Sequence, residues 1–163
     1  MKKSLVVLIT TLTLNSCLIS KSIQSSKAKT EFTEENNAIP VNFGENSNEI
    51  LLAIEKSDDK AYNGFLKRGL KKNYFGNYKI VKKIDLIGDE YNDLNKYRYF
   101  FDYDNGSYYR VGNESGYLKR YYVYDRLTKT KYKAGSEFTF YAKALKIYLS
   151  NLEQKRLSNK WLK

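Results

Sequence analysis

Aromatic side chains occur at every second position in the middle of the chain, and this alternation constrains the fold more than any other feature. The clearest stretch holds Tyr97, Tyr99, Phe101 and Tyr103. Successive side chains of a strand point to opposite faces of a sheet, so a period of two indicates a strand with one buried face. Eleven of the sixteen tyrosines lie between residues 91 and 132. We therefore expect an antiparallel meander in this region.

Turn signals divide the meander into strands. Asn105-Gly106 follows the first aromatic run. An Asn-Gly pair between two such runs is a strong hairpin signal, because both central residues of a type I′ turn need positive φ. We therefore predict a hairpin turn at residues 104–107, another turn at 112–116, and a second hairpin formed by 117–125 and 130–133.

The acidic residues beside this turn also invite comparison with a calcium-binding loop. Such a loop of the helix–loop–helix kind needs Gly at position 6 and Glu at position 12. Counted from Asp102, Gly106 falls at position 5 and Asn113 at position 12. The register fails, and a turn accounts for the same residues.

A strand–helix–strand unit is expected before the meander, over residues 49–86. Residues 49–55 are an apolar run typical of a buried strand, with a helical turn as the competing assignment. Residues 57–59 then supply an N-cap and two acidic groups. The apolar residues at helical spacing after them are Ala61, Phe65, Leu66 and Leu70. Residues 78–86 alternate like a second strand, which should pair in parallel with the first if the two are neighbours.

The C-terminal region has the spacing of an amphipathic helix. Its large apolar residues recur at intervals of three and four, at Phe138, Tyr141, Leu145, Tyr148 and Leu152. The fold class is therefore α+β, in a single domain over residues 39–163. It comprises the strand–helix–strand unit, the antiparallel meander and the C-terminal amphipathic helix, with both helices on one face of the sheet.

Missing residue types exclude whole classes of chemistry. The chain has no histidine and a single cysteine. Triads that use His, His-bearing metal sites, internal disulfides and Cys₄ zinc sites are therefore excluded. We predict no catalytic residues, no metal ligands and no cofactor.

The N-terminus has the pattern of an export signal. Lys2 and Lys3 precede residues 5–14, which are apolar apart from threonines. Ten such residues are too few to span a bilayer but suit the apolar region of a signal peptide. Leu14-Asn15-Ser16-Cys17 follows at once and contains the only cysteine. This motif resembles the lipobox of bacterial lipoproteins, whereas an ordinary secretory signal with an incidental cysteine is the alternative.

The resemblance implies a lipid anchor. The Cys17 thiol would receive a diacylglyceryl group, residues 1–16 would be removed as the signal peptide, and the new amino terminus would be acylated. Two or three acyl chains anchor a protein firmly in a membrane. Leu18 after the cysteine favours the outer membrane, and the absence of a carboxylate before Glu31 favours its periplasmic face. Residues 17–38 are mostly polar and are expected to form a flexible, lipid-anchored tether.

The tyrosine-rich meander supplies a candidate binding surface. Exposed tyrosines beside basic residues can stack on sugars, peptides or bases. The residues we select are Tyr108, Tyr109, Arg110, Lys119, Arg120 and Tyr122. An AT-rich genome, which favours codons for Lys, Asn, Ile, Tyr and Phe, is an equally weighted explanation of this composition. Because the protein is expected to be exported, no physiological nucleic-acid partner is predicted.

Carboxylates are densest just before the meander. Asp85, Asp89, Glu90 and Asp93 are the best place to look for a general acid and base, with Asp125 as a lone further candidate. Linear spacing does not show that the four meet in a pocket, and Gly88-Asp89-Glu90 is also typical of a solvated loop.

The charge and the anchor together suggest the class of function. The net charge is +11, and basic residues are densest over 119–133 and in the last helix. Such surfaces can contact anionic headgroups or merely remain solvated. We expect an envelope lipoprotein that binds or scaffolds an envelope protein or glycan without catalysis, in an undetermined oligomeric state. The alternatives are an immunity-type lipoprotein that neutralises an acidic protein toxin, and a carboxylate-dependent hydrolase of envelope glycans.

Overall fold

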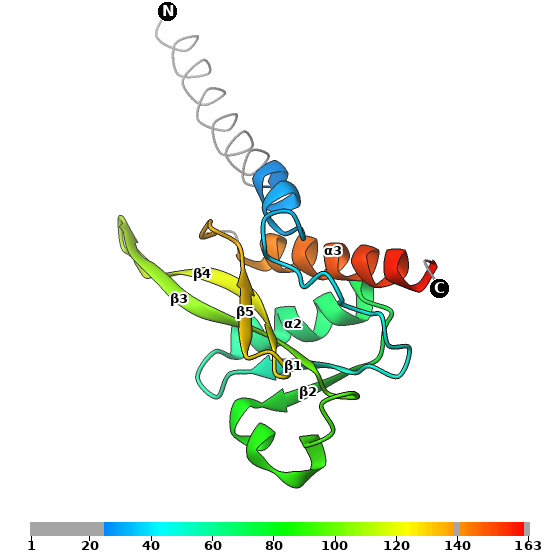
Figure 1. Cartoon of the computed structure of the whole chain (residues 1–163). Coiled ribbons are helices and arrows are strands. Elements are labelled where there is room, and N and C mark those ends of the chain that lie inside the picture. Colours follow the sequence, from blue (N-terminus) through cyan, green and yellow to red (C-terminus); the bar gives the residue numbers. More distant parts are fainter. Residues whose placement is uncertain (1–24, 139–140, 162–163) are drawn as a thin grey trace, which may run out of the picture.

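A five-stranded mixed sheet forms the centre of the protein (Figure 1). The computed structural model describes residues 25–138 and 141–161, so the signal peptide and Cys17 lie outside the described residues. The strands are β1 (Leu51–Glu55), β2 (Tyr78–Lys82), β3 (Tyr99–Val111), β4 (Glu114–Asp125) and β5 (Thr130–Lys133). Residues 25–31 are helical, and the other helices are α2 (Lys60–Asn73), α3 (Tyr141–Trp161) and the 3₁₀ helices η1 (Lys83–Ile87) and η2 (Asp89–Tyr91). The predicted α+β class is confirmed.

The sheet has the order β2-β1-β3-β4-β5. β1 pairs in parallel with β2 and β3, whereas β3, β4 and β5 are antiparallel. The expected strand–helix–strand unit is therefore present, and α2 begins where predicted because the Asp59 carboxylate accepts the Tyr62 N–H at 2.9 Å. The second strand is shorter than expected. Asp85 accepts the Lys82 N–H at 2.9 Å, and the chain turns into η1 there.

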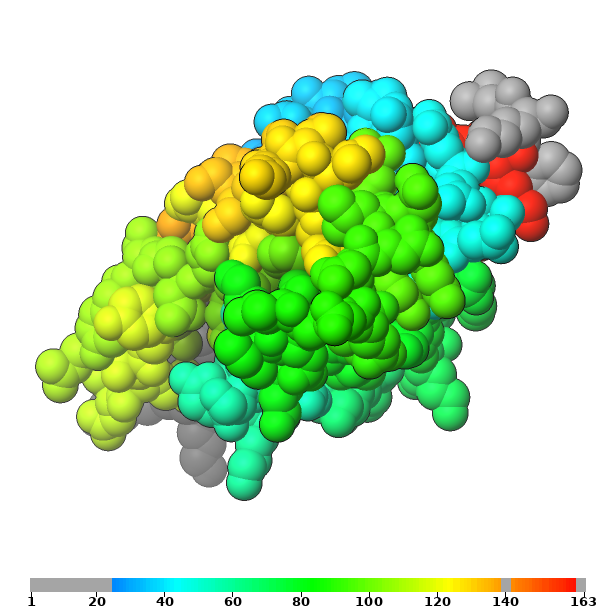
Figure 2. All heavy atoms as spheres, turned by 60° about the horizontal axis from the view of Figure 1, so that its bottom comes forward, coloured from blue at the N-terminus to red at the C-terminus, as the bar shows by residue number. Residues whose placement is uncertain are grey.

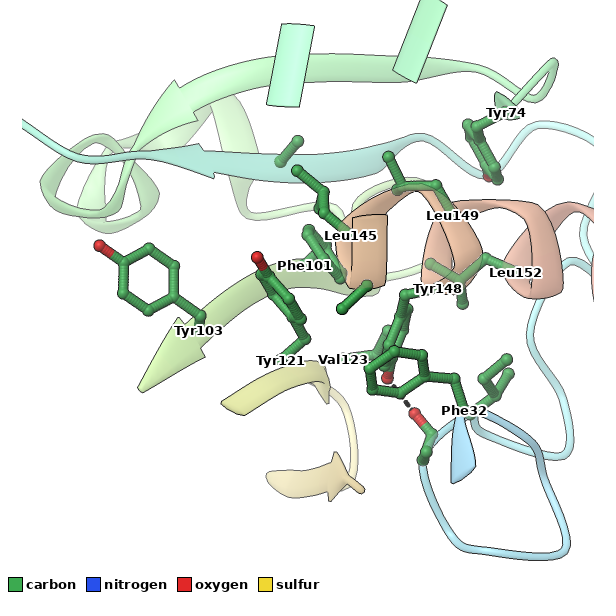
Figure 3. Close-up of a cluster of buried hydrophobic side chains, with 14 of the residues drawn as sticks. Phe32, Tyr74, Phe101, Tyr103, Tyr121, Val123, Leu145, Tyr148, Leu149 and Leu152 are labelled. Atoms are coloured by element: carbon green, nitrogen blue, oxygen red, sulfur yellow. Dashed lines mark hydrogen bonds between the residues drawn. The ribbon is translucent and has the colours of Figure 1, made fainter. Parts of the chain in front are cut away.

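The main core lies between the sheet and both long helices, which cover the same face. Figure 3 shows the α3 part of this core, with Leu145, Tyr148 and Leu152 among side chains of the sheet. Leu145, Tyr148 and Leu152 of α3 are fully buried against Phe101 and Val123 of the sheet. Their spacing is the one that predicted this helix. The Tyr148 hydroxyl, at the centre of the cluster, donates to the backbone carbonyl of Ala38.

A smaller apolar cluster covers the other face of the sheet. Here Leu52, Ile54 and Phe100 pack against Tyr91 and Tyr97, which come from the chain between β2 and β3. Figure 2 shows this segment, in green, spread over the face opposite the helices. The sheet is therefore buried on both sides near β1. No helix among residues 25–138 and 141–161 is both long and apolar enough to cross a membrane.

The predicted hairpin turn at residues 104–107 is wrong. β3 continues through these residues, and the pairing with β4 shifts by one residue between Asn105 and Tyr108, which is a β-bulge. The hairpin instead turns after Val111, where Gly112 has φ of 61°. The bulge persists because Glu137 fills it: its carboxylate accepts the Ser107 N–H at 2.8 Å and lies where a side chain at Gly106 would be.

Within the described residues, the part of β3 from Asp104 onward and the part of β4 up to Arg120 pair with each other and with no further named strand, and Lys119 forms an isolated bridge with Phe138. They form a projecting two-stranded arm, residues 104–120 (Figure 1). The second predicted hairpin, from β4 to β5, is confirmed.

The domain begins earlier than predicted. Residues 25–31 are helical, and Ala28, Phe32 and Ala38 are buried in the main core. Asn151 of α3 donates to the backbone carbonyl of Phe32 at 2.8 Å and so holds this segment in place. Residues 25–38 are thus part of the folded domain and not of a flexible tether. The few apolar residues of this segment are enough to hold it against the domain, because they pack against side chains of the main core.

We predict that Phe32→Ala lowers the free energy of unfolding by about 3–5 kcal/mol, the usual cost of truncating a buried phenylalanine. Phe32 is 0% exposed and contacts the rings of Phe138 and Tyr148 at centroid distances of 5.0 and 4.5 Å. Urea unfolding of the full chain measures the change, and Phe75→Ala, at a 74% exposed position, is the control. A loss below about 1 kcal/mol would show that residues 25–38 contribute little to the core.

Candidate functional site

The six residues of the predicted tyrosine surface do not form one exposed surface. Tyr108 and Arg110 are exposed on the arm, and Tyr109 is half-buried over Gly116. Arg120 is half-buried and forms an ion pair with Glu137. Lys119 and Tyr122 are buried on opposite faces of β4. The structure therefore brings only the residues near the tip of the arm together.

Lys119 belongs to a buried network between β4 and the start of α2. Its ammonium lies 2.7 Å from the Asp59 carboxylate and 3.8 Å from the centre of the Tyr103 ring. The Tyr103 hydroxyl donates to the same carboxylate at 2.9 Å. Burial opposes ionisation of Asp59, but these hydrogen bonds outweigh it and lower its pKa. The network joins the N-cap of α2 to the sheet, which is a structural role.

A second network lies on the opposite face. The Asp102 carboxylate is fully buried and accepts the Tyr122 hydroxyl at 3.0 Å. Lys56, directly after β1, contacts it at 2.5 Å, and Lys83, directly after β2, lies 3.8 Å away. Removing one partner of a buried ion pair leaves an uncompensated charge, so these residues hold the strand ends in place.

The predicted acid–base cluster has local structural partners. The Asp85 carboxylate accepts a hydrogen bond from the Lys82 N–H, and Glu90 forms an ion pair with Lys79 at 2.5 Å. The Asp89 carboxylate accepts the Asn92 amide at 3.0 Å. The isolated candidate Asp125 is buried, paired with Arg98 at 2.7 Å, and accepts the Leu127 N–H of the β4–β5 turn. The fourth member of the cluster, Asp93, lines a groove.

This groove lies where β1 and β2 begin, and we call it the amino-edge groove. It consists of two adjoining hollows of about 550 and 580 Å³ that share Asn46 and Asn77. Its walls come from residues 44–50, 74–77 and 93–96, and from the C-terminal part of α3. Each of the two hollows has a volume in the range of small-ligand sites.

Arg156 of α3 forms one end of the groove. Its side chain passes between Gly44 and Gly76, and a Cβ at either position would overlap it. Gly44 also has φ of 80°, which other residues rarely adopt. The buried Glu153 carboxylate accepts two hydrogen bonds from Arg156 and one, at 3.1 Å, from the Phe75 N–H. The helix therefore fixes the loop before β2.

The other loops of the groove are joined by hydrogen bonds. Ile50 N–H donates to the Lys96 carbonyl at 2.8 Å, and Leu51 N–H donates to the Asn77 carbonyl at 2.9 Å. The Asn46 amide donates to the Asn95 carbonyl at 3.0 Å. The three wall segments are thus held together without a ligand.

Glu49 is the buried titratable group of the groove. It is 8% exposed, and among the described residues its carboxylate accepts one hydrogen bond, a long one of 3.3 Å from the Gly44 N–H. Burial raises its pKa to about 7, although that hydrogen bond and the positive charge of Arg98 act in the opposite direction. A carboxyl that titrates near neutral pH inside a cavity is characteristic of functional sites.

Three further amide side chains line the groove. The side-chain amides of Asn48, Asn77 and Asn95 are exposed and make no hydrogen bond within the part of the chain that the structure describes. Phe75 lies in the same wall with 74% of its surface exposed. Sequence reasoning missed the groove. Gly44 and Gly76 were the available signals, but nothing in the sequence indicated that both contact Arg156.

A further hollow of about 660 Å³ lies between residues 29–35 and α3. Within the described ranges, no group of three or more acidic, cysteine or histidine side chains is arranged to hold a metal ion. No protein-family model matches the chain, and no curated protein and no solved structure is significantly similar to it.

We predict that Glu49→Gln reduces the pH dependence of stability. The folded protein holds the Glu49 proton more tightly than the unfolded chain, so its contribution to the free energy of unfolding falls as pH rises from about 4.5 to 7. The variant should therefore gain stability relative to the unaltered chain across this interval, by at most about 3 kcal/mol. Urea unfolding at pH 4.5, 6 and 8 measures the difference, and a constant difference would contradict the assignment.

Proposed function

We propose that this protein is a lipid-anchored, non-catalytic binding protein of the bacterial cell envelope. The observation that carries the binding function is the amino-edge groove. Its walls are connected by hydrogen bonds, while the side-chain amides of Asn48, Asn77 and Asn95 make none to the residues that the structure describes. A preformed cavity with unpaired polar groups is the usual form of a ligand site.

The anchor is proposed at Cys17, with the protein on the periplasmic face of the outer membrane. Seven residues, 18–24, lie between this cysteine and Ser25, the first described residue. They can span at most about 25 Å. The earlier start of the domain shortens the expected tether, so an anchored domain would be restricted to the immediate neighbourhood of the bilayer.

A carboxylate-dependent hydrolase of envelope glycans is the second candidate. One observation favours it: Glu45 and Glu49 line the same groove, and the pKa of Glu49 is raised to about 7 by burial. Such a carboxyl can act as a general acid at neutral pH. The carboxylates selected from the sequence support the binding proposal over the hydrolase, because Asp85, Asp89 and Glu90 are engaged by structural partners.

We predict that Cys17→Ser releases the protein from membranes. Without the thiol no diacylglyceryl group can be attached, and the firm anchoring that two or three acyl chains give is lost. Membrane fractionation of cells that express the chain and the variant measures the change. Mass spectrometry of the native product should show a cleaved, acylated Cys17. A variant that still sediments with membranes, or a bare thiol on the mature protein, would contradict the anchor.

We also predict that the full chain captures an envelope glycan or several envelope assembly proteins from detergent-solubilised envelope. The double variant Phe75→Ala, Asn77→Ala should reduce the capture, because it removes two exposed groups of the groove and leaves the buried contacts unchanged. One stoichiometric acidic protein would support the immunity-type alternative and contradict this proposal. Cleavage of the glycan that is abolished by Glu49→Gln would support the hydrolase.

A further inference from the structure

We infer that the amino-edge groove binds a neutral oligosaccharide. This inference rests on the proposed binding function and names the class of ligand. The shape of the groove is the first observation. Two hollows adjoin at Asn46 and Asn77, so the cavity extends along the ends of β1 and β2. A linear chain of sugar rings fits such a cavity better than a single compact molecule does.

The hydrogen-bonding groups are the second observation. A side-chain amide presents a donor and an acceptor side by side in one plane. Two neighbouring hydroxyl groups of a sugar match this arrangement, since each hydroxyl both donates and accepts. Asn48, Asn77 and Asn95 carry such amides along the two hollows and use none of them within the described part of the protein. Ser47, in the first hollow, adds a hydroxyl.

Phe75 is the third observation. Its ring is 74% exposed, although its own N–H is fixed by Glu153 at 3.1 Å. A large apolar side chain on a fixed backbone beside polar groups offers a flat surface for the apolar face of a sugar ring, as aromatic side chains do in ligand sites. The adjacent Tyr74 is buried and contacts Tyr78 edge to face, with 6.4 Å between ring centres, which supports this wall from behind.

The charge of the groove favours a neutral ligand. Its carboxylates are Glu45, Glu49 and Asp93, and its cations are Lys96, Arg156 and Lys160. Arg156 is already paired with Glu153 at 2.7 Å, which leaves Glu45 and Asp93 against Lys96 and Lys160. Burial raises the pKa of Glu49 to about 7, so this carboxyl adds only part of a negative charge at neutral pH. The chain as a whole has a net charge of +11, so an acidic polymer or peptide would find a stronger positive potential elsewhere on the protein.

The test is calorimetric titration of the full chain in a detergent that has no sugar headgroup. The probes are tetramers of N-acetylglucosamine, of β-linked glucose and of α-linked glucose, with a tetramer of glutamate as the acidic probe. We expect saturable binding of at least one saccharide. Phe75→Ala should weaken it about tenfold and Asn77→Ala about fivefold, as expected for loss of one stacking contact or one hydrogen-bonding group.

Matched variants separate the groove from general effects. Ile87→Ala removes another highly exposed apolar side chain, and Asn113→Ala removes another exposed amide, both outside the groove. Neither should change the affinity, whereas Phe75→Trp should retain it. Equal effects of the control and groove variants would overturn the assignment.

The possible failures are distinguishable. If no saccharide of the panel binds while the full chain still captures an envelope component, the oligosaccharide inference is wrong and the binding function stands. If neither occurs, both are wrong. If the glutamate tetramer binds and its affinity falls in the Phe75 and Asn77 variants, the groove takes an acidic peptide, and the inference is overturned.

Discussion

The docking of α3 is the interaction on which the rest of the structure depends. Its apolar side, centred on Tyr148, fills the space between the sheet and the N-terminal segment. Its polar side chains then fix three loops, because each forms a hydrogen bond with a backbone group in a loop. Asn151 holds residue 32, Asn159 holds the carbonyls of Val41 and Phe43, and Glu153 holds the N–H of Phe75. One helix thus holds segments that lie 78 to 119 residues before their partners in it.

Local patterns predicted the elements whose residues contact their own neighbours in sequence. The N-cap at Asp59 and the three-and-four spacing of α3 are examples, since both depend on distances within one helix. The prediction of a turn at Asn105-Gly106 was wrong because a distant residue, Glu137, stabilises a bulge at the same place. The Asn-Gly pair is compatible with either a turn or a bulge, and the contact with Glu137 decides between them.

The start of the domain and the groove were missed for the same reason. Phe32 is surrounded by polar residues in the sequence, and only the surface of α3 makes its burial favourable. The groove is built from three loops and one helix, which meet because β1 and β2 begin side by side. Such loops carry no periodicity. Of the predicted tyrosine surface, the residues near the tip of the arm are the most exposed, whereas Lys119 and Tyr122 are buried.

The two edge strands of the sheet affect how copies of the protein associate at high density. β2 and β5 each leave one row of backbone groups unpaired, and such edges can recruit a strand from another molecule. Lys79 and Lys131 at these edges are paired with Glu90 and Asp104. The exposed Lys82 on β2 and Lys133 on β5 form no ion pair among the described residues. Two copies that approached edge to edge would bring like charges together. Dense two-dimensional packing, as on a bilayer, should therefore leave the molecules separate instead of polymerising them into extended sheets.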